Sequence, residues 1–384
     1  MNLFKASRQW ATRPEDERFS TLEELDAAVN TYRADAREAT VPFDTLRAAA
    51  QDGEVLLVGK SNQPARLTNW SFGQLSSAVG APASYLRQLP ATLAAQNLNH
   101  GLGKTEDRTD RQLLLHKNGD FLVRAITSEK YTRIWNGDIT KRLLQLPQSG
   151  WQVPPARPAF SGQKGTRLAT IEDVLHGAKH GLSVNVGDEI APAGLYASDH
   201  DMFVFMVNDA ARISEPGNPD GLARGFFITN SEVGAASFAV TRFLYRHVCG
   251  NHIVWDAKQV SELRIKHIGD ADDRAFGELT GQLVEYANDS ASDDEARIKR
   301  AYTTVLGKDK DEVLDRLFGI RNLGLARRTL DLAYDLIEVR EPELNPNSVW
   351  GMAQGLTRLS QETNFADERV AADRAAGKVL SIAF

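Results

Sequence analysis

The spacing of apolar residues predicts different secondary structure in different parts of the chain. From about Asp270 onward, apolar residues recur at helical spacing, as at Leu314, Leu317 and Phe318, and predict helices only. Between residues 111 and 230, short apolar runs separated by turn residues predict strands instead. Before residue 110 the pattern predicts mainly helices, with one short strand at 54–58.

The centre of the chain carries the clearest strand signals. Apolar runs at 189–197, 202–207 and 225–229 predict three strands, and the stretch Ala236–Val248 predicts a helix that stops near Gly250. An Asn-Gly pair at 118–119, between apolar runs at 111–116 and 121–126, predicts a hairpin. We therefore expect an α+β protein with a central antiparallel β-β-β-α core, a mostly helical C-terminal part and a small helical N-terminal part.

These patterns divide the chain into three regions. We expect an N-terminal region at 1–110 with a helix-turn-helix-like hairpin at 72–89, a β-rich core with a basic helix at 111–268, and an acidic all-helical region at 269–384. The second helix of the hairpin carries a single arginine, Arg87, which is too little positive charge to anchor duplex phosphates. We therefore interpret the hairpin as a packing element.

The charge of the chain is unevenly distributed. The 384 residues carry a formal net charge of −6, which excludes a protein that coats duplex DNA by charge alone. Lys+Arg number 12, 18 and 15 in the three regions, against 14, 15 and 22 Asp+Glu, which gives balances of −2, +3 and −7. The middle region is the only one with a positive balance, so a local basic groove there is compatible with the acidic total.

The cysteine content and the apolar runs indicate the compartment. The single cysteine, Cys249, excludes an intrachain disulfide and is typical of a reducing compartment. The first residues lack the apolar core of a signal peptide, and apolar runs such as 202–207 are too short to cross a bilayer. We expect a cytoplasmic protein with no membrane partner.

The motifs of two common enzyme classes are incomplete. Gly59-Lys60-Ser61 follows Gly53 at the wrong spacing for a phosphate-binding loop. Cys249 lies near the end of an apolar helix face, where a cysteine usually packs as a small apolar residue and does not act as a nucleophile. We predict no catalytic residue and no cofactor.

A metal site is the remaining candidate for enzyme chemistry. His176 and His180 are four residues apart on a predicted helix, and Asp199 and His200 could complete a site with them. The glutamate of a zincin motif is absent, since Gly177 follows His176. Two histidines on a helix surface are the simpler interpretation of this pattern.

The middle region combines cations with aromatic residues. This combination suits a nucleic-acid single strand, because cations follow the phosphates and rings stack on the bases. The alternative is that Tyr245 and Trp255 belong to the core and that the arginines pair with nearby acids. The candidate contacts are Arg124, Lys130, Tyr131, Arg133, Trp135, Arg242, Tyr245, Arg246, Asn251, His252, Trp255, Lys258, Arg264 and Lys266.

A long central motif resembles a known family. Asn230-Ser231-Glu232-Val233-Gly234-Ala235-Ala236-Ser237, with the stretch 243–255 after it, is similar to domain of unknown function 932. Shorter similar stretches lie at 124–131, 198–205 and 348–352, so the resemblance spans roughly residues 60–365. The family consists of phage- and plasmid-like proteins, and the resemblance implies a mobile element without an established reaction.

Charge, motif and predicted core together lead to one functional expectation. We expect a phage- or plasmid-associated protein that binds single-stranded DNA in recombination, by annealing, or in replication. The β-β-β-α order with a basic helix also resembles the core of single-strand annealing proteins. The acidic C-terminal helices would serve a homo-oligomer or a protein partner. Two alternatives stay open: a metal-dependent enzyme that acts on nucleic acid, and a protein-binding factor that counters a host defence.

Overall fold

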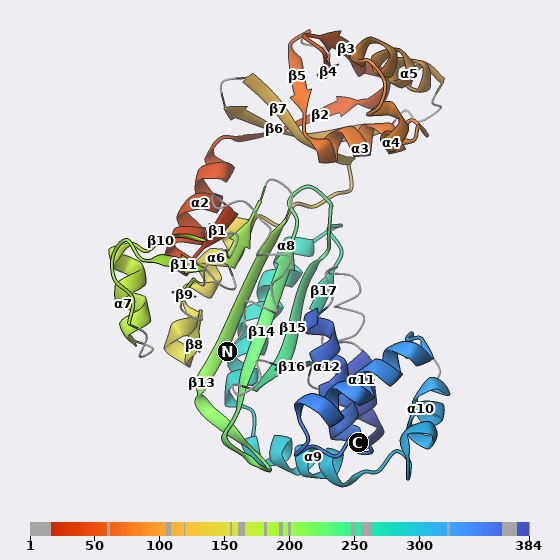
Figure 1. The fold of residues 1–384 in the computed structure, drawn as a ribbon. Coiled ribbons are helices and arrows are strands. Elements are labelled where there is room, and N and C mark those ends of the chain that lie inside the picture. Colours follow the sequence, from red (N-terminus) through yellow and green to blue (C-terminus); the bar gives the residue numbers. More distant parts are fainter. Residues whose placement is uncertain are drawn as a thin grey trace.

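Three sheets of different size organise the described part of the chain, as the computed structural model shows (Figure 1). A six-stranded sheet forms an N-terminal lobe, an eight-stranded sheet occupies the centre, and a three-stranded sheet belongs to a small side lobe. Helices and antiparallel sheets are both prominent, so the predicted α+β class is confirmed. The described residues are 17–59, 62–104, 109–118, 120–153, 156–159, 166–179, 183–191, 195–198, 201–246, 251–254, 263–320, 323–362 and 375–383.

The N-terminal lobe packs helices against one sheet. Buried residues such as Leu75, Leu98 and Val123 fill the space between them. The strands, in the order of their pairing, are β2 (Ala36–Pro42), β6 (Asp110–Asn118), β7 (Asp120–Ser128), β5 (Pro64–Leu67), β4 (Glu54–Val58) and β3 (Arg47–Gln51). The helices are α3 (Asn69–Ala78), α4 (Ala83–Leu86) and α5 (Ala91–Lys104), with a 3-10 turn, η3, at Phe43–Thr45.

The sequence predicted a mainly helical N-terminal region, but this lobe is built on a six-stranded sheet. β2 and β3 have polar or alanine-rich sequences that carry little strand signal, and they become strands by pairing with β6 and β4. The predicted hairpin is confirmed as β6–β7. The predicted helix-turn-helix corresponds to α3 and α4, of which α4 is a single turn. The boundary expected at residue 110 falls where β6 begins, within this sheet.

The central sheet is antiparallel and covered by helices on one face. α2 (Leu22–Ala34), α6 (Asn136–Leu143), a 3-10 turn η4 (Leu146–Ser149) and α8 (Ala271–Asn288) pack on residues such as Val204 and Phe226. The strands, in the order of pairing, are β1 (Arg18–Phe19), β12 (Leu195–Ala197), β13 (Met202–Glu215), β14 (Asn218–Asn230), β15 (Phe238–Arg246) and β16 (Asn251–Val254), with β8 (Trp151–Gln152) on β13 and β17 (Leu263–Ile265) on β15.

The helix predicted at Ala236–Val248 is wrong, because Phe238–Arg246 is strand β15. Phe238 packs on the face that carries α8, and Phe243 packs on the opposite face. A segment with apolar residues on both faces satisfies helical and strand periods alike, and pairing with β14 and β16 decides between them. The predicted β-β-β-α core is therefore a continuous run of strands. The strand expected at 189–197 is also divided, into β11 (Glu189–Ala191) and β12.

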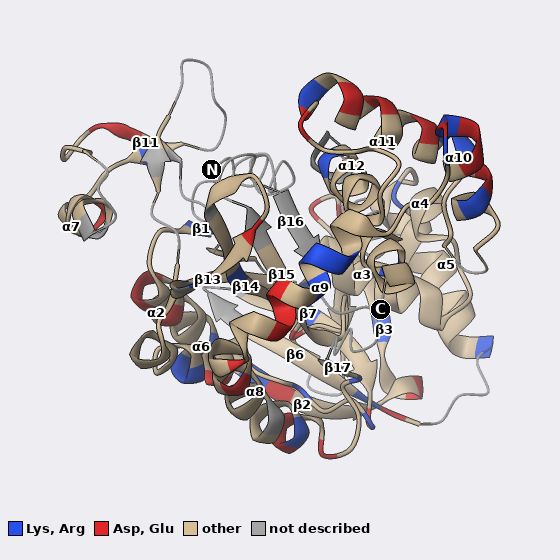
Figure 2. Cartoon of the chain, turned by 90° about the horizontal axis from the view of Figure 1, so that it is seen from below, with Lys and Arg blue, Asp and Glu red and all other residues tan. Residues whose placement is uncertain are grey.

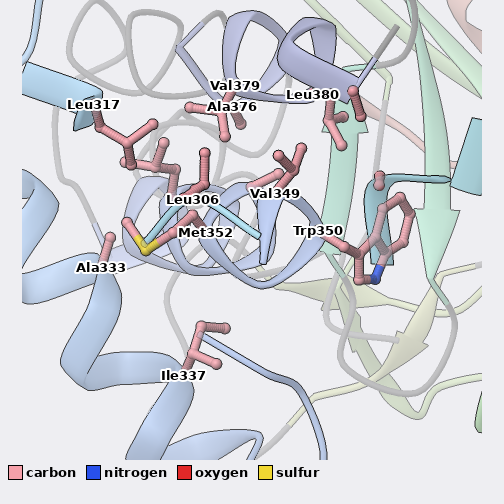
Figure 3. Close-up of a cluster of buried hydrophobic side chains, with 14 of the residues drawn as sticks. Leu306, Leu317, Ala333, Ile337, Val349, Trp350, Met352, Ala376, Val379 and Leu380 are labelled. Atoms are coloured by element: carbon pink, nitrogen blue, oxygen red, sulfur yellow. The ribbon is translucent and has the colours of Figure 1, made fainter. Parts of the chain in front are cut away.

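The C-terminal helices pack on the other end of the central sheet. A cluster of buried side chains around Trp350 and Met352 joins them to Ile213, Leu222 and Leu244 of the strands (Figure 3). The predicted helical C-terminal part is confirmed within the described residues, although most of the helix expected at 367–376 lies outside them. None of the described helices is long and apolar enough to cross a membrane. The elements are α9 (Ala291–Thr303), α10 (Lys310–Phe318), α11 (Arg327–Arg340), α12 (Val349–Glu362), a helical stretch at 375–380 and η5 (Ser381–Ala383).

The side lobe projects from the flank of the central sheet (Figure 1). It consists of β9 (Arg157–Pro158), β10 (Arg167–Leu168), β11 and helix α7 (Ile171–Lys179), with β11 between the other two strands. Its core is small and contains Ala156, Ala169, Val184 and Ile190.

Candidate nucleic-acid interface

Four phenylalanines form a row on the face of the central sheet opposite to α8. Phe203 and Phe205 come from β13, Phe227 from β14 and Phe243 from β15. Their rings stack in near-parallel pairs. The ring centroids are 5.6 Å apart for Phe203 and Phe227, 4.9 Å for Phe205 and Phe243, and 6.3 Å for Phe227 and Phe243, with interplanar angles of 20–25°. We call these four residues the phenylalanine row.

The row depends on a glycine in the middle strand. Gly225 on β14 is the register partner of Phe243, and a Cβ atom at Gly225 would lie 2.1 Å from the Phe243 ring. The missing side chain therefore lets this ring lie across β14. Phe205 and Phe243 are buried, whereas Phe203 and Phe227 are half-buried and retain contact with solvent.

Several predicted nucleic-acid contacts lie on the strands beside this row. Tyr245 pairs with His252, and Arg246 with Asn251, across β15 and β16. Arg264 on β17 pairs with Ala239. The backbone of these five residues is described and their side chains are not, while Trp255 and Lys258 lie outside the described residues altogether.

Two predicted cations are exposed on neighbouring segments. Lys130 precedes Tyr131, and Lys266 precedes His267. An isolated antiparallel bridge joins Tyr131 to Ile268, and the Thr132 amide donates to the His267 carbonyl at 2.9 Å. The fold thus places the segments that carry these two lysines side by side, although they are 136 positions apart in the sequence, and both lysine side chains are exposed.

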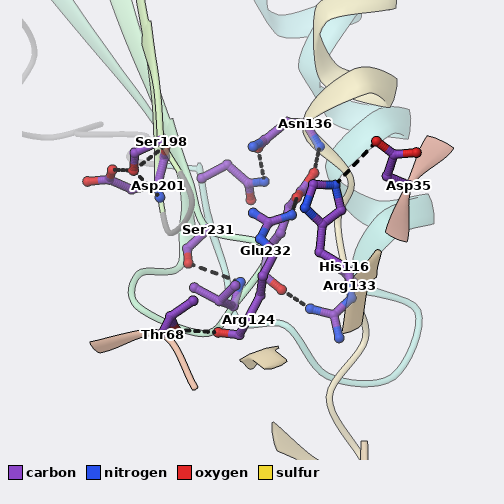
Figure 4. Close-up of polar contacts among 12 residues, drawn as sticks. Asp35, Thr68, His116, Arg124, Arg133, Asn136, Ser198, Asp201, Ser231 and Glu232 are labelled. Atoms are coloured by element: carbon purple, nitrogen blue, oxygen red, sulfur yellow. Dashed lines mark hydrogen bonds and ion pairs between the residues drawn. The ribbon is translucent and has the colours of Figure 1, made fainter. Parts of the chain in front are cut away.

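Two other predicted cations are buried in a polar junction between the N-terminal lobe and the central sheet (Figure 4). Arg124 on β7 forms an ion pair with Glu232, with Nη1 and Oε2 3.4 Å apart and both side chains at most 5% exposed. Arg133 donates through Nε to Glu38 at 2.8 Å and through Nη1 to the backbone carbonyl of Glu232. For these two arginines the structure shows pairing with acids, and both acids are distant in the sequence.

Glu232 is the centre of this junction and comes from the motif Asn230-Ser231-Glu232. The amide of Asn136, at the start of α6, donates to its Oε1 at 2.9 Å. Asn230 donates to the Ile134 carbonyl and to the Asn136 side chain, while the Ser231 hydroxyl accepts from the amides of Val233 and Ala235. Polar groups of the N-terminal lobe and of the central sheet with its helices therefore hold the loop between β14 and β15.

Two predicted aromatic contacts line the same junction. Tyr131 stacks on His267 with centroids 5.0 Å apart and donates its hydroxyl to the Ser231 carbonyl at 2.8 Å. Burial raises the pKa of Tyr131 above its ordinary value and lowers the pKa of His267 to about 4. Trp135 lies under the guanidinium groups of Arg33 and Arg133. Both rings are therefore occupied by internal contacts.

Arg242 belongs to the covered face of the sheet. Its guanidinium donates to the Gln282 carbonyl at 3.1 Å and lies over the ring of Tyr286, both on α8. The opposite face carries the phenylalanine row. The expected basic helix is a strand, so its cations do not follow one helical face.

The side chains of the predicted metal ligands are not among those that the structure describes. His176 is on α7 without a described side chain, and His180, Asp199 and His200 lie outside the described residues, as does Cys249. Among the residues that the structure does describe, no three His, Cys, Asp or Glu side chains gather as a metal site.

The chain matches no protein-family model, no curated protein and no solved structure. The resemblance to domain of unknown function 932 therefore stays a prediction.

Sequence reasoning did not identify the phenylalanine row or the Arg124–Glu232 pair. Phe203 and Phe205 alternate along a strand, and that period of two is the signal that was present for the row. The ion pair joins residues 108 positions apart, so no local pattern marks it.

Proposed function

We propose that this chain binds single-stranded DNA along the phenylalanine row of its central sheet. Stacked rings on a sheet face that keep contact with solvent, as Phe203 and Phe227 do, provide planes for bases. In a duplex the faces of the bases are already stacked on one another, so the phenylalanine row suits single-stranded DNA. This row is the observation that carries the proposal.

The charge distribution supports the same partner. The middle region has the balance of +3, and Lys130 and Lys266 expose their ammonium groups. The strand of Phe243, β15, also carries Tyr245 and Arg246, and the next strand, β16, carries His252. A DNA single strand bound on the phenylalanine row would have its phosphates near these cations. The acidic C-terminal helices would repel the same phosphates.

The proposed cellular role rests on the predicted resemblance to domain of unknown function 932. A phage- or plasmid-like protein that holds a single strand on a sequence-neutral stacking surface suits recombination by annealing, or replication. Neither role needs a catalytic residue, which agrees with the incomplete enzyme motifs.

A salt-dependent titration tests the proposal. Fluorescence anisotropy of a labelled single-stranded oligonucleotide should show micromolar or tighter binding. The logarithm of the binding constant should fall linearly with the logarithm of the salt concentration. The matching duplex should bind more weakly. If folded protein does not bind the oligonucleotide at low salt, the proposal is overturned.

Substitutions in the row test its location. Phe203→Leu with Phe227→Leu keeps apolar bulk but removes the two ring faces, and we expect roughly tenfold weaker binding, about 1.4 kcal/mol. Phe203→Tyr keeps a ring and serves as the matched control, with affinity near that of the wild type. Equal affinity of the leucine variant and the wild type would place the DNA elsewhere.

A further inference from the structure

The side lobe exposes more large apolar residues than its size explains. Leu168, Ile171, Leu175 and Val186 are 54–65% exposed, while the core of the lobe consists of two alanines, Val184 and Ile190. Ile171 and Leu175 are four residues apart on α7, so they share one helix face. Single exposed apolar residues are normal, whereas several on one small projecting unit mark a contact surface.

Carboxylates accompany these apolar side chains. Glu172 follows Ile171, Glu189 is the register partner of Leu168, and Asp188 is two residues from Val186, all three exposed. The guanidinium of Arg167 instead turns toward the buried carboxylate of Asp173, at 2.8 Å. The described part of the lobe therefore presents an apolar surface with negative charge.

Helix α11 carries the complementary surface. Leu332 and Val339 are 45% and 75% exposed, and half-buried Leu336 lies between them, so the spacing of four and three residues gives one stripe. Arg328 and Arg340 are exposed near its two ends, without an ion pair among the described residues. On the flank of the stripe, Lys310 pairs with both Asp331 and Asp335, and Glu338 beside Val339 is exposed, so among the described residues the unpaired positive charge lies at the two ends.

The two surfaces lie on opposite sides of the molecule. Figures 1 and 2 show α7 at one side and α10 and α11 at the other, in views turned by 90°. One chain cannot join its own two surfaces, but a second copy can join them. The occupant that fits an acidic apolar lobe is thus the basic-ended apolar stripe of a neighbouring copy.

We infer that the side lobe of one copy docks through α7 onto the α11 stripe of the next copy. This contact is heterologous, since different surfaces meet, and repetition therefore produces a ring if the rotation closes and a filament if it does not. The inference is independent of DNA binding. It assigns the predicted self-assembly to a defined pair of surfaces.

Mixing two variants tests this pairing. Leu175→Asp places a charge on the apolar face of α7, and Val339→Asp places a charge at the most exposed position of the stripe on α11. Sedimentation velocity without DNA should show concentration-dependent assemblies for the wild type and monomers for each variant alone. In a mixture, the intact lobe of the Val339→Asp chain meets the intact stripe of the Leu175→Asp chain. The expected product is a one-to-one dimer and nothing larger.

Each other outcome contradicts the inference. A monomeric wild type at all concentrations overturns self-association, and a Val339→Asp variant that still assembles overturns the role of the stripe. A mixture that stays monomeric overturns the pairing of the two surfaces. Tyr85→Asp, at a 56% exposed position on the N-terminal lobe, is the control and should assemble like the wild type. Circular dichroism verifies that all variants are folded.

Discussion

The N-terminal lobe and the C-terminal helices attach to the same central sheet by different proportions of polar and apolar contact. The C-terminal helices bury a large apolar cluster around Trp350, which stacks on Tyr302 with centroids 5.2 Å apart. The N-terminal lobe meets the sheet through buried charges and hydrogen bonds around Glu232, with a small apolar cluster that includes Leu114, Ala125 and Val233.

This difference predicts different responses to the same perturbation. The stability that apolar burial contributes is proportional to the buried area and does not depend on pH near neutrality. A buried ion pair offsets the desolvation cost of its charges only while both partners are present and aligned. The lobe contact should therefore be sensitive mainly to single charge changes and to acid. The helical contact should be sensitive mainly to loss of volume, and its charged component is the buried Arg224–Asp294 pair at 2.6 Å.

The largest effect should come from Trp350→Ala. The indole is fully buried, and its Nε1 donates to the buried Glu215 at 3.2 Å. Truncation leaves a cavity and removes one donor from Glu215, so the free energy of unfolding should fall by about 5 kcal/mol in urea denaturation. Trp350→Phe keeps most of the volume and should lose less than half as much. Equal losses for both variants would contradict the packing argument.

The next effect should come from Glu232→Ala. This variant leaves the Arg124 guanidinium buried without its carboxylate, so we expect a loss of about 4 kcal/mol in the free energy of unfolding. Hydrogen exchange should rise mainly in the loop 231–237 and in the start of α6. The double variant Arg124→Met, Glu232→Gln removes both charges and should recover part of the loss. No recovery would mean that the charges are not coupled.

Acid should weaken the junction by up to about 3 kcal/mol. The pKa of buried His267 is about 4, against about 6.5 for an ordinary histidine, so the unfolded chain binds more protons between these values. The free energy of unfolding should therefore fall as pH decreases from 6.5 to 4. His267→Asn cannot take up this proton and keeps a donor for the Thr132 carbonyl, so its pH dependence should be flatter in that window. An unchanged slope would remove His267 as the cause.

The smallest effect should come from Glu54→Gln. Its carboxylate accepts from Arg66 at 2.6 and 2.7 Å, which is better geometry than the Arg124–Glu232 pair has, but both side chains are about half exposed. Solvent screens such a pair, and the loss in urea denaturation should be less than about 1 kcal/mol. A loss as large as that of Glu232→Ala would mean that burial does not decide the strength of these pairs.

The sequence predicted the elements whose signals are local. Helices α8 to α12 follow from apolar spacing, and the β6–β7 hairpin follows from Asn118-Gly119. β3 reads Arg-Ala-Ala-Ala-Gln and has no strand signal, so its conformation comes from pairing with β4. β15 satisfies both periods, and its place between two strands decides its structure.

The same distinction applies to the candidate site. Arg124 and Arg133 look like phosphate contacts in the sequence because their acidic partners, Glu232 and Glu38, are far along the chain. The phenylalanine row is assembled from three strands, and only the alternation of Phe203 and Phe205 within β13 is visible locally. Residue types showed which chemistry the middle region could supply, and the fold shows which side chains reach the surface.

Photo-cross-linking tests the proposed function most directly. A single-stranded oligonucleotide with photoreactive pyrimidines, irradiated in complex with the full chain, should cross-link to Phe203 or Phe227, and peptide mass spectrometry should locate the adduct on β13 or β14. The yield should fall for the variant with Phe203→Leu and Phe227→Leu. Binding with cross-links confined to the N-terminal lobe or the C-terminal helices would contradict a single strand on the phenylalanine row.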